Sequence, residues 1–147
     1  METDLAIYFT LFWNAFIAAT LLPALSEVTL ASLVAASVGK PIFLFAAATT
    51  GNVAGSALNW WLGFRLADFR HRKWFPFSEE HISRASRHFN HYGTWSLLFA
   101  WLPIVGDPLT LVAGMFKTRF SLFLVLVTVG KAVRYGVIIL IISKTQS

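Results

Sequence analysis

The stretch PIFLFAAATTGNVAGSALNWWLGF, residues 41–64, runs for 24 residues without a charged side chain. A membrane-spanning helix needs about 20 predominantly apolar residues. Residues 120–143 form a second apolar stretch of 24 residues, in which Lys131 and Arg134 are the charged side chains. These two stretches predict two membrane-spanning helices.

The composition of the whole chain also indicates an integral membrane protein. Of its 147 residues, 56% are hydrophobic and only 13% are charged, whereas soluble domains carry about 25% charged residues. A chain this short could not bury so much apolar surface in a water-soluble fold. The composition therefore excludes a soluble domain, a disordered chain and a coiled coil. The absence of cysteine excludes disulfides and thiolate chemistry.

Three shorter apolar segments are too short to cross a bilayer alone; they are residues 28–39, 92–102 and 108–116. Each is joined to a neighbouring segment through a proline and an acid, which favours re-entrant hairpins that enter and leave on the same side. The expected hairpin turns contain Pro23, Ser26, Pro103 and Gly106. The first arm, residues 5–22, is long enough to span, so the first hairpin either re-enters or spans.

The two halves of the chain resemble each other. Residues 22–27 read Leu-Pro-Ala-Leu-Ser-Glu and residues 102–107 read Leu-Pro-Ile-Val-Gly-Asp, with an acid at the same offset. With one crossing per half, the second copy is inserted upside down, as in many transporters; chance similarity of apolar segments is the alternative. We predict an all-α integral membrane protein with one membrane domain, 1–147. It comprises repeat A (5–64), a basic linker (65–91) and repeat B (92–143).

Basic residues are distributed unevenly about the predicted spans. Eight fall on the side of the linker 65–91 and two on the other, which places the linker in the cytoplasm and both chain ends outside. Residues 78–92 read as an amphipathic helix with an apolar stripe at Ile82, Ala85, Phe89 and Tyr92. We expect this cytoplasmic helix to lie on the membrane surface, with its basic residues facing anionic lipid.

Four charged residues lie within apolar segments: Glu27, Asp107, Lys131 and Arg134. Each costs at least about 2.5 kcal/mol in a bilayer, so we expect Glu27 or Asp107 within ion-pair reach of Lys131 or Arg134. The functional interpretation is a substrate and ion-coupling site, where the cations hold a phosphate and a carboxylate carries protons. The alternative is a set of structural ion pairs.

Local explanations compete with function at several of these positions. Asp107 before Pro108 fits a helix N-cap, and Ser26 offers the same role in the first hairpin. Gly51, Asn52 and Gly55 favour close helix packing.

No pattern of catalytic residues occurs in the chain. His81, His88 and His91 share a rough helical face, but contact with lipid headgroups is a better expectation than a metal site. We expect no catalytic residues, no metal and no cofactor, and hence not an enzyme.

Several motifs together resemble the DedA family, also called the VTT or SNARE-associated family, and most closely its short YqaA-like branch. They are Leu22–Val28, Gly51–Gly55, the run from Tyr92-Gly93 to Asp107, Ala113-Gly114 and Gly130–Tyr135. The resemblance implies facing re-entrant hairpins, a multi-pass protein of the bacterial inner membrane and lipid translocation. Typical members carry arginines beside the second Leu-Pro element. Here Ala100 and residues 104–106 stand in those places, and we expect Lys131 and Arg134 to replace them.

The leading functional hypothesis is therefore a DedA-type flippase for a lipid or lipid phosphate, coupled to protons. The partners that this hypothesis implies are membrane lipids such as undecaprenyl phosphate or a phospholipid, protons and a second copy of the chain in a homo-oligomer, with no nucleic acid. The alternatives are a non-transporting assembly or structural protein and a small ion channel.

Overall fold

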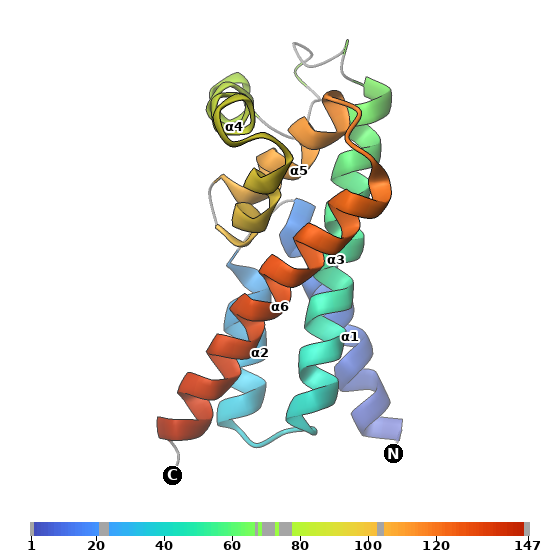
Figure 1. Ribbon diagram of the computed structural model, residues 1–147. Helices are drawn as coiled ribbons and strands as arrows, with labels where there is room; N and C mark the ends of the chain where they lie inside the picture. The colour runs from blue at the N-terminus through green and yellow to red at the C-terminus, as the bar shows by residue number, and fades with distance from the viewer. Residues whose placement is uncertain are drawn as a thin grey trace. The chain divides into compact units, whose positions relative to one another are not determined.

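The computed structural model describes residues 2–20, 24–66, 68, 73, 78–102 and 105–145. These residues are helical, with no strand among them (Figure 1). The elements are α1 (Glu2–Thr20), α2 (Leu25–Ala35), α3 (Pro41–Leu66), α4 (Glu79–Tyr92), the 3₁₀-helix η2 (Gly93–Trp101), α5 (Gly106–Met115) and α6 (Phe120–Thr145). The prediction of an all-helical chain is confirmed. Pro23 and Pro103, two of the expected turn residues, lie outside the described residues.

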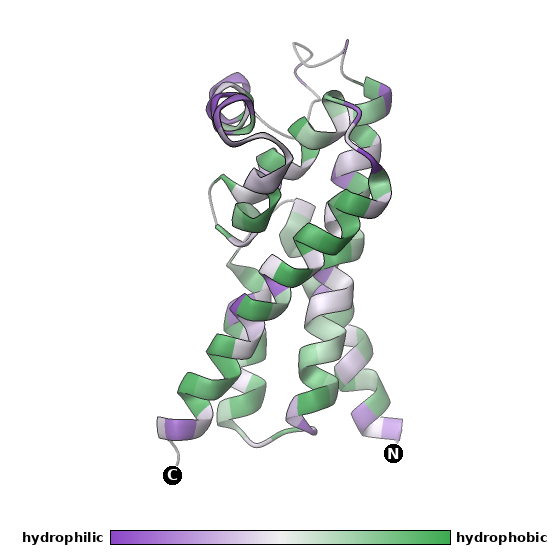
Figure 2. Ribbon diagram, viewed as in Figure 1, coloured by the Kyte–Doolittle hydropathy of each residue, from purple (hydrophilic) through white to green (hydrophobic). Residues whose placement is uncertain are grey.

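Helices α3 and α6 are the two candidate membrane spans among the described residues, as predicted. Each has 26 residues, which gives about 39 Å of helix against a hydrocarbon core of about 30 Å. Figure 2 shows that both are predominantly hydrophobic, whereas α4 is strongly hydrophilic. One side of α6 exposes apolar side chains at every fourth position, namely Val125, Val129, Val133, Val137 and Ile141. Such a face is suited to lipid.

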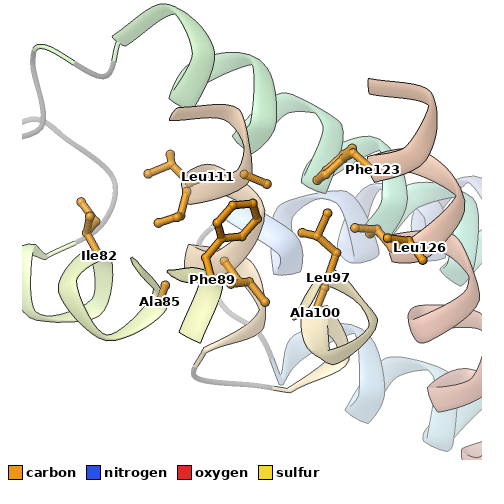
Figure 3. Packing of buried hydrophobic residues seen from close by; sticks show 12 residues of the cluster. Ile82, Ala85, Phe89, Leu97, Ala100, Leu111, Phe123 and Leu126 are labelled. Carbon is orange, nitrogen blue, oxygen red and sulfur yellow. The ribbon is translucent and has the colours of Figure 1, made fainter. Parts of the chain in front are cut away.

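The chain forms two compact units, and α3 and α6 each contribute to both. Unit 1 comprises Met1–Gly55 and Lys131–Ser147, and unit 2 comprises Ser56–Gly130. The core of unit 1 consists of Leu11, Leu30, Val34, Leu44, Ala48 and Tyr135. The core of unit 2 joins α4, η2, α5 and α6, and Figure 3 labels eight of its residues. Each unit thus has its own apolar core.

Glycines bring α3 close to α1 within unit 1. A methyl group at Gly51 would overlap the carbonyl oxygen of Phe12, and one at Gly55 would meet the carbonyl of Phe16 and the side chain of Ala19. The amide of Asn52 donates a hydrogen bond to the Ala15 carbonyl oxygen, at 2.9 Å. The two backbones therefore approach more closely than any larger residue at these positions would allow.

The same helix-ending turn occurs in both halves of the chain. After α2, the Val38 N–H donates to Leu33 O at 2.9 Å and the Ser37 N–H donates to Val34 O at 3.0 Å. After α5, Thr118 and Lys117 make the equivalent bonds to Ala113 and Gly114, at 3.0 and 2.9 Å. This is a Schellman turn, and its left-handed residue is Ser37 in one copy and Lys117 in the other, both at φ 54°. The offset of 80 residues equals the offset between Leu22 and Leu102, so these turns support the internal repeat.

Glycine at either left-handed position should stabilise the protein. Ser37→Gly and Lys117→Gly remove a Cβ from a conformation that favours glycine, and we expect each to raise the free energy of unfolding by about 0.5–1 kcal/mol. Thermal unfolding in detergent measures this effect. Ser32→Gly, inside α2, is the control and should be destabilising. A loss of stability in Ser37→Gly or Lys117→Gly would contradict the assigned turn.

Helix α4 confirms the expected amphipathic helix. The Ser78 side chain caps it by accepting a hydrogen bond from the His81 N–H, and Gly93, at φ 64°, ends it. However, Ile82, Ala85 and Phe89 are buried in the core of unit 2 (Figure 3), and the Phe89 ring stacks on Phe116 with 5.0 Å between centroids. Three of the four stripe residues therefore pack on protein, whereas Tyr92 is exposed. The location of this helix on the membrane surface stays a prediction. Contact of the basic residues with anionic lipid stays a prediction.

Candidate functional site

A cluster of polar side chains joins α2, α3 and α6 inside unit 1. Lys131, on α6, is only 1% exposed, and its ammonium group donates a hydrogen bond to the Asn52 side-chain oxygen on α3. Because the Asn52 amide also bonds to α1, this one side chain connects three helices. A buried ammonium group needs such acceptors, since desolvation without hydrogen bonds is costly. Asn52 therefore combines helix packing with contact to a buried cation.

Arg134 and Glu27 form an ion pair between α6 and α2. Both the Nε and the Nη2 of Arg134 contact Glu27 Oε1. The Arg134 side chain is 12% exposed and the Glu27 side chain 32% exposed. The structure thus brings together one expected acid–base combination, Glu27 with Arg134. The pair is therefore only partly buried, and Arg134 is the more buried partner.

The residues adjacent to this pair make a second contact between the same two helices. The hydroxyl groups of Ser26 and Tyr135 share a hydrogen bond of 2.8 Å, and both residues are 1% exposed. Ser26 lies within α2, whose N-cap position is Ala24, so the interpretation of Ser26 as an N-cap is wrong. Sequence reasoning gave Tyr135 no role, although its spacing from Lys131 and Arg134 places all three near one helical face.

One buried hydroxyl on α3 extends this polar region. Thr49 lies one turn before Asn52 and is buried, and its Oγ1 has no hydrogen-bond partner among the described residues. Buried polar groups are usually paired with protein or with water. The position is therefore suited to a bound water beside the helix face that carries Asn52.

Asp107 lies in unit 2 and is 8% exposed. It is the second residue of α5, whose N-cap position is Val105, so the N-cap interpretation of Asp107 is wrong. An acid in the first turn is still favoured by the helix dipole. Gly106, just before it, leaves room for the carbonyl oxygen of Ala100, which a methyl group would overlap. The start of α5 is therefore closely packed against η2.

Two cavities in unit 1 lie apart from the Glu27–Arg134 pair. One, of about 680 Å³, is lined by the start of α1, the turn after α2 and the start of α3. The other, of about 230 Å³, lies between α1 and α2. Neither is lined by Glu27 or Arg134.

Comparison with known proteins assigns the family. The VTT domain model matches residues 22–144. Inner membrane protein YqaA of Escherichia coli is 34% identical over 127 residues, covering 86% of this chain and 84% of its own length. An uncharacterised protein of Haemophilus influenzae is 32% identical, covering 85% of this chain and 80% of its own length. No solved structure matches the chain. The chain therefore belongs to the VTT-domain, or DedA, family of membrane proteins, and it is an inner-membrane protein.

Proposed function

We propose that this protein moves a lipid or lipid phosphate across the inner membrane. The observation that carries the proposal is the partly exposed ion pair that Arg134, in a candidate spanning helix, makes with Glu27 of α2. Arg134 lies 14 residues after Phe120, which places it about 21 Å along a helix of about 39 Å. Ionisable residues at such depth commonly mark substrate or ion pathways. Arginine is suited to a phosphate because its guanidinium fork binds two oxygens at once.

A proton couples naturally to such a site. While Glu27 is ionised it occupies the Arg134 guanidinium, and a lipid phosphate competes with it for the same donors. Protonation of Glu27 removes the negative charge and releases Arg134 for the phosphate. In this scheme Lys131 supplies further buried charge, and Thr49 is a place for water. Asp107, in unit 2, stays a candidate coupling residue. Exchange of proton for phosphate is the proposed coupling.

The repeated Schellman turns support an inverted repeat of hairpin and span, the arrangement from which transporters build central sites. Within unit 1, Figure 1 shows the start of α1, the turn between α2 and α3 and the end of α6 at one end. This agrees with placing the two ends of the chain on the same side of the membrane, which the distribution of basic residues predicts to be the outside.

Cysteine labelling tests this topology directly, because the chain contains no cysteine. We expect a cysteine at Thr3 to react with a membrane-impermeant maleimide applied from outside. A cysteine at Ser78 should react only after the membrane is opened. Labelling of both positions from the same side would contradict the inverted repeat.

Reconstituted vesicles test the transport itself. We expect vesicles containing the wild-type protein to move fluorescent phospholipid or undecaprenyl phosphate between leaflets faster than protein-free vesicles do. If every lipid moves at the same rate in vesicles with and without the protein, the result would favour the rival interpretation, a non-transporting assembly or structural protein. The near-complete burial of Lys131, Ser26 and Tyr135 is the observation that supports this rival.

A further inference from the structure

We infer that Tyr135 is a positioning residue: its hydroxyl, through Ser26, fixes the start of α2 so that Glu27 meets Arg134. The inference rests on the proposed function and extends it to a residue pair outside the expected site. The two contacts are made by consecutive residues on both helices, Ser26 and Glu27 on α2 and Arg134 and Tyr135 on α6. The position of one contact therefore constrains the other.

The Tyr135 ring is held rigidly enough to act as a reference point. It is 1% exposed and belongs to the apolar core of unit 1, together with Leu30 of α2 and Leu44 and Ala48 of α3. Side chains in close-packed cores occupy fixed rotamers. The hydroxyl at the far end of this ring consequently has one position, in which it meets Ser26.

Among the described residues, the start of α2 has no side-chain cap. Its N-cap residue, Ala24, makes no side-chain capping hydrogen bond. Uncapped helix ends leave several N–H groups without partners inside the helix and fray easily. The buried hydroxyl bond between Ser26 and Tyr135 takes over this role through a tertiary contact. Without it, Glu27 would sit on a loose first turn, and its geometry with Arg134 would be less well defined.

Double-mutant cycles distinguish positioning from a merely structural role. Tyr135→Phe removes only the hydroxyl, and we expect it to lower the unfolding temperature in detergent by about 5 °C, mostly because the Glu27–Arg134 pair loses its alignment and to a smaller extent because Ser26 loses its buried partner. In a Glu27→Gln background the same change should have less than half that effect, because no ion pair remains to be positioned. Equal effects in both backgrounds would overturn the inference.

Tyr8→Phe is the matched control. The Tyr8 hydroxyl accepts a hydrogen bond of 2.9 Å from the Lys40 N–H, also in unit 1 but away from the ion pair. Tyr8→Phe should change the unfolding temperature by the same amount in the wild-type protein and in the Glu27→Gln background. If Tyr8→Phe is coupled to Glu27→Gln as strongly as Tyr135→Phe is, the inference is overturned, because the coupling would then reflect a general destabilisation of unit 1.

Lipid movement gives a second measurement. Per folded molecule, Tyr135→Phe should slow lipid movement about tenfold, Ser26→Ala should do the same, and the double variant should be no slower than either. Unchanged rates in both single variants would overturn the inference while leaving the transport proposal intact. If the wild-type protein moves no lipid, the proposed function fails, and the unfolding cycle still decides whether Tyr135 positions Glu27.

Discussion

Replacing Gly114 with alanine should prevent unit 2 from folding normally, with an expected loss of more than about 3 kcal/mol in the free energy of unfolding. A methyl group at Gly114 would overlap the carbonyl oxygen of Trp60 on α3. A methyl group at Gly63 would in turn overlap the carbonyl oxygen of Leu111 on α5. The clash is with backbone on both sides, so no side chain can rotate away to relieve it.

Gly136→Ala is the matched control for this prediction. A methyl group there would have its nearest neighbour, an atom of the Phe45 ring, at 3.9 Å, an ordinary contact distance. This change should be neutral or slightly stabilising, because alanine favours a helix over glycine. Expression yield, the elution profile in detergent and thermal unfolding compare the variants. A Gly114→Ala protein as stable as Gly136→Ala would contradict the close crossing of α3 and α5.

Removing one member of the Glu27–Arg134 pair is expected to have the second large effect. Loss of one partner from a fully buried pair costs about 3–5 kcal/mol because it leaves a buried charge uncompensated. Glu27 is about one-third exposed, so we expect about 2–3 kcal/mol for Arg134→Ala. The double variant Glu27→Ala/Arg134→Ala should be more stable than Arg134→Ala alone.

The exposed pair between Arg84 and Glu80 on α4 provides a control for this cycle. Its nitrogen–oxygen distance is 3.0 Å, with side-chain exposures of 42% and 76%. Exposed pairs contribute about 0.2–1 kcal/mol, so Arg84→Ala should cost little. If Arg84→Ala lowers the free energy of unfolding as much as Arg134→Ala does, burial of the Glu27–Arg134 pair is unimportant. Additive effects of the two substitutions in the Glu27–Arg134 cycle would lead to the same conclusion.

The long apolar runs were sufficient to predict α3 and α6, because bilayer thickness sets the length of a spanning helix. Helix α4 was also predictable, since Ser78, the acidic first turn and Gly93 are local signals. The burial cost of isolated charges led to the expectation of an acid–base pair. The sequence did not distinguish which of four combinations would form, because that depends on how α2 meets α6.

The features that were not predictable depend on contacts between distant residues. The stripe of α4 is the same pattern whether it packs on lipid or on protein, and only the fold places Phe89 against Phe116. The bond between Ser26 and Tyr135 joins residues 109 positions apart, and neither hydroxyl has a local signature. The starts of α2 and α5 also differ from the expected caps, because Ser26 and Asp107 lie inside the helices.

The rate of lipid movement in vesicles that contain Arg134→Gln, compared with Arg84→Gln, tests the central claim most directly. Both substitutions remove one positive charge from an arginine that pairs with a glutamate. If Arg134 holds a lipid phosphate inside the membrane, Arg134→Gln should slow the movement at least about tenfold per folded molecule, and Arg84→Gln should keep the wild-type rate. Equal rates in the two variants would contradict the claim.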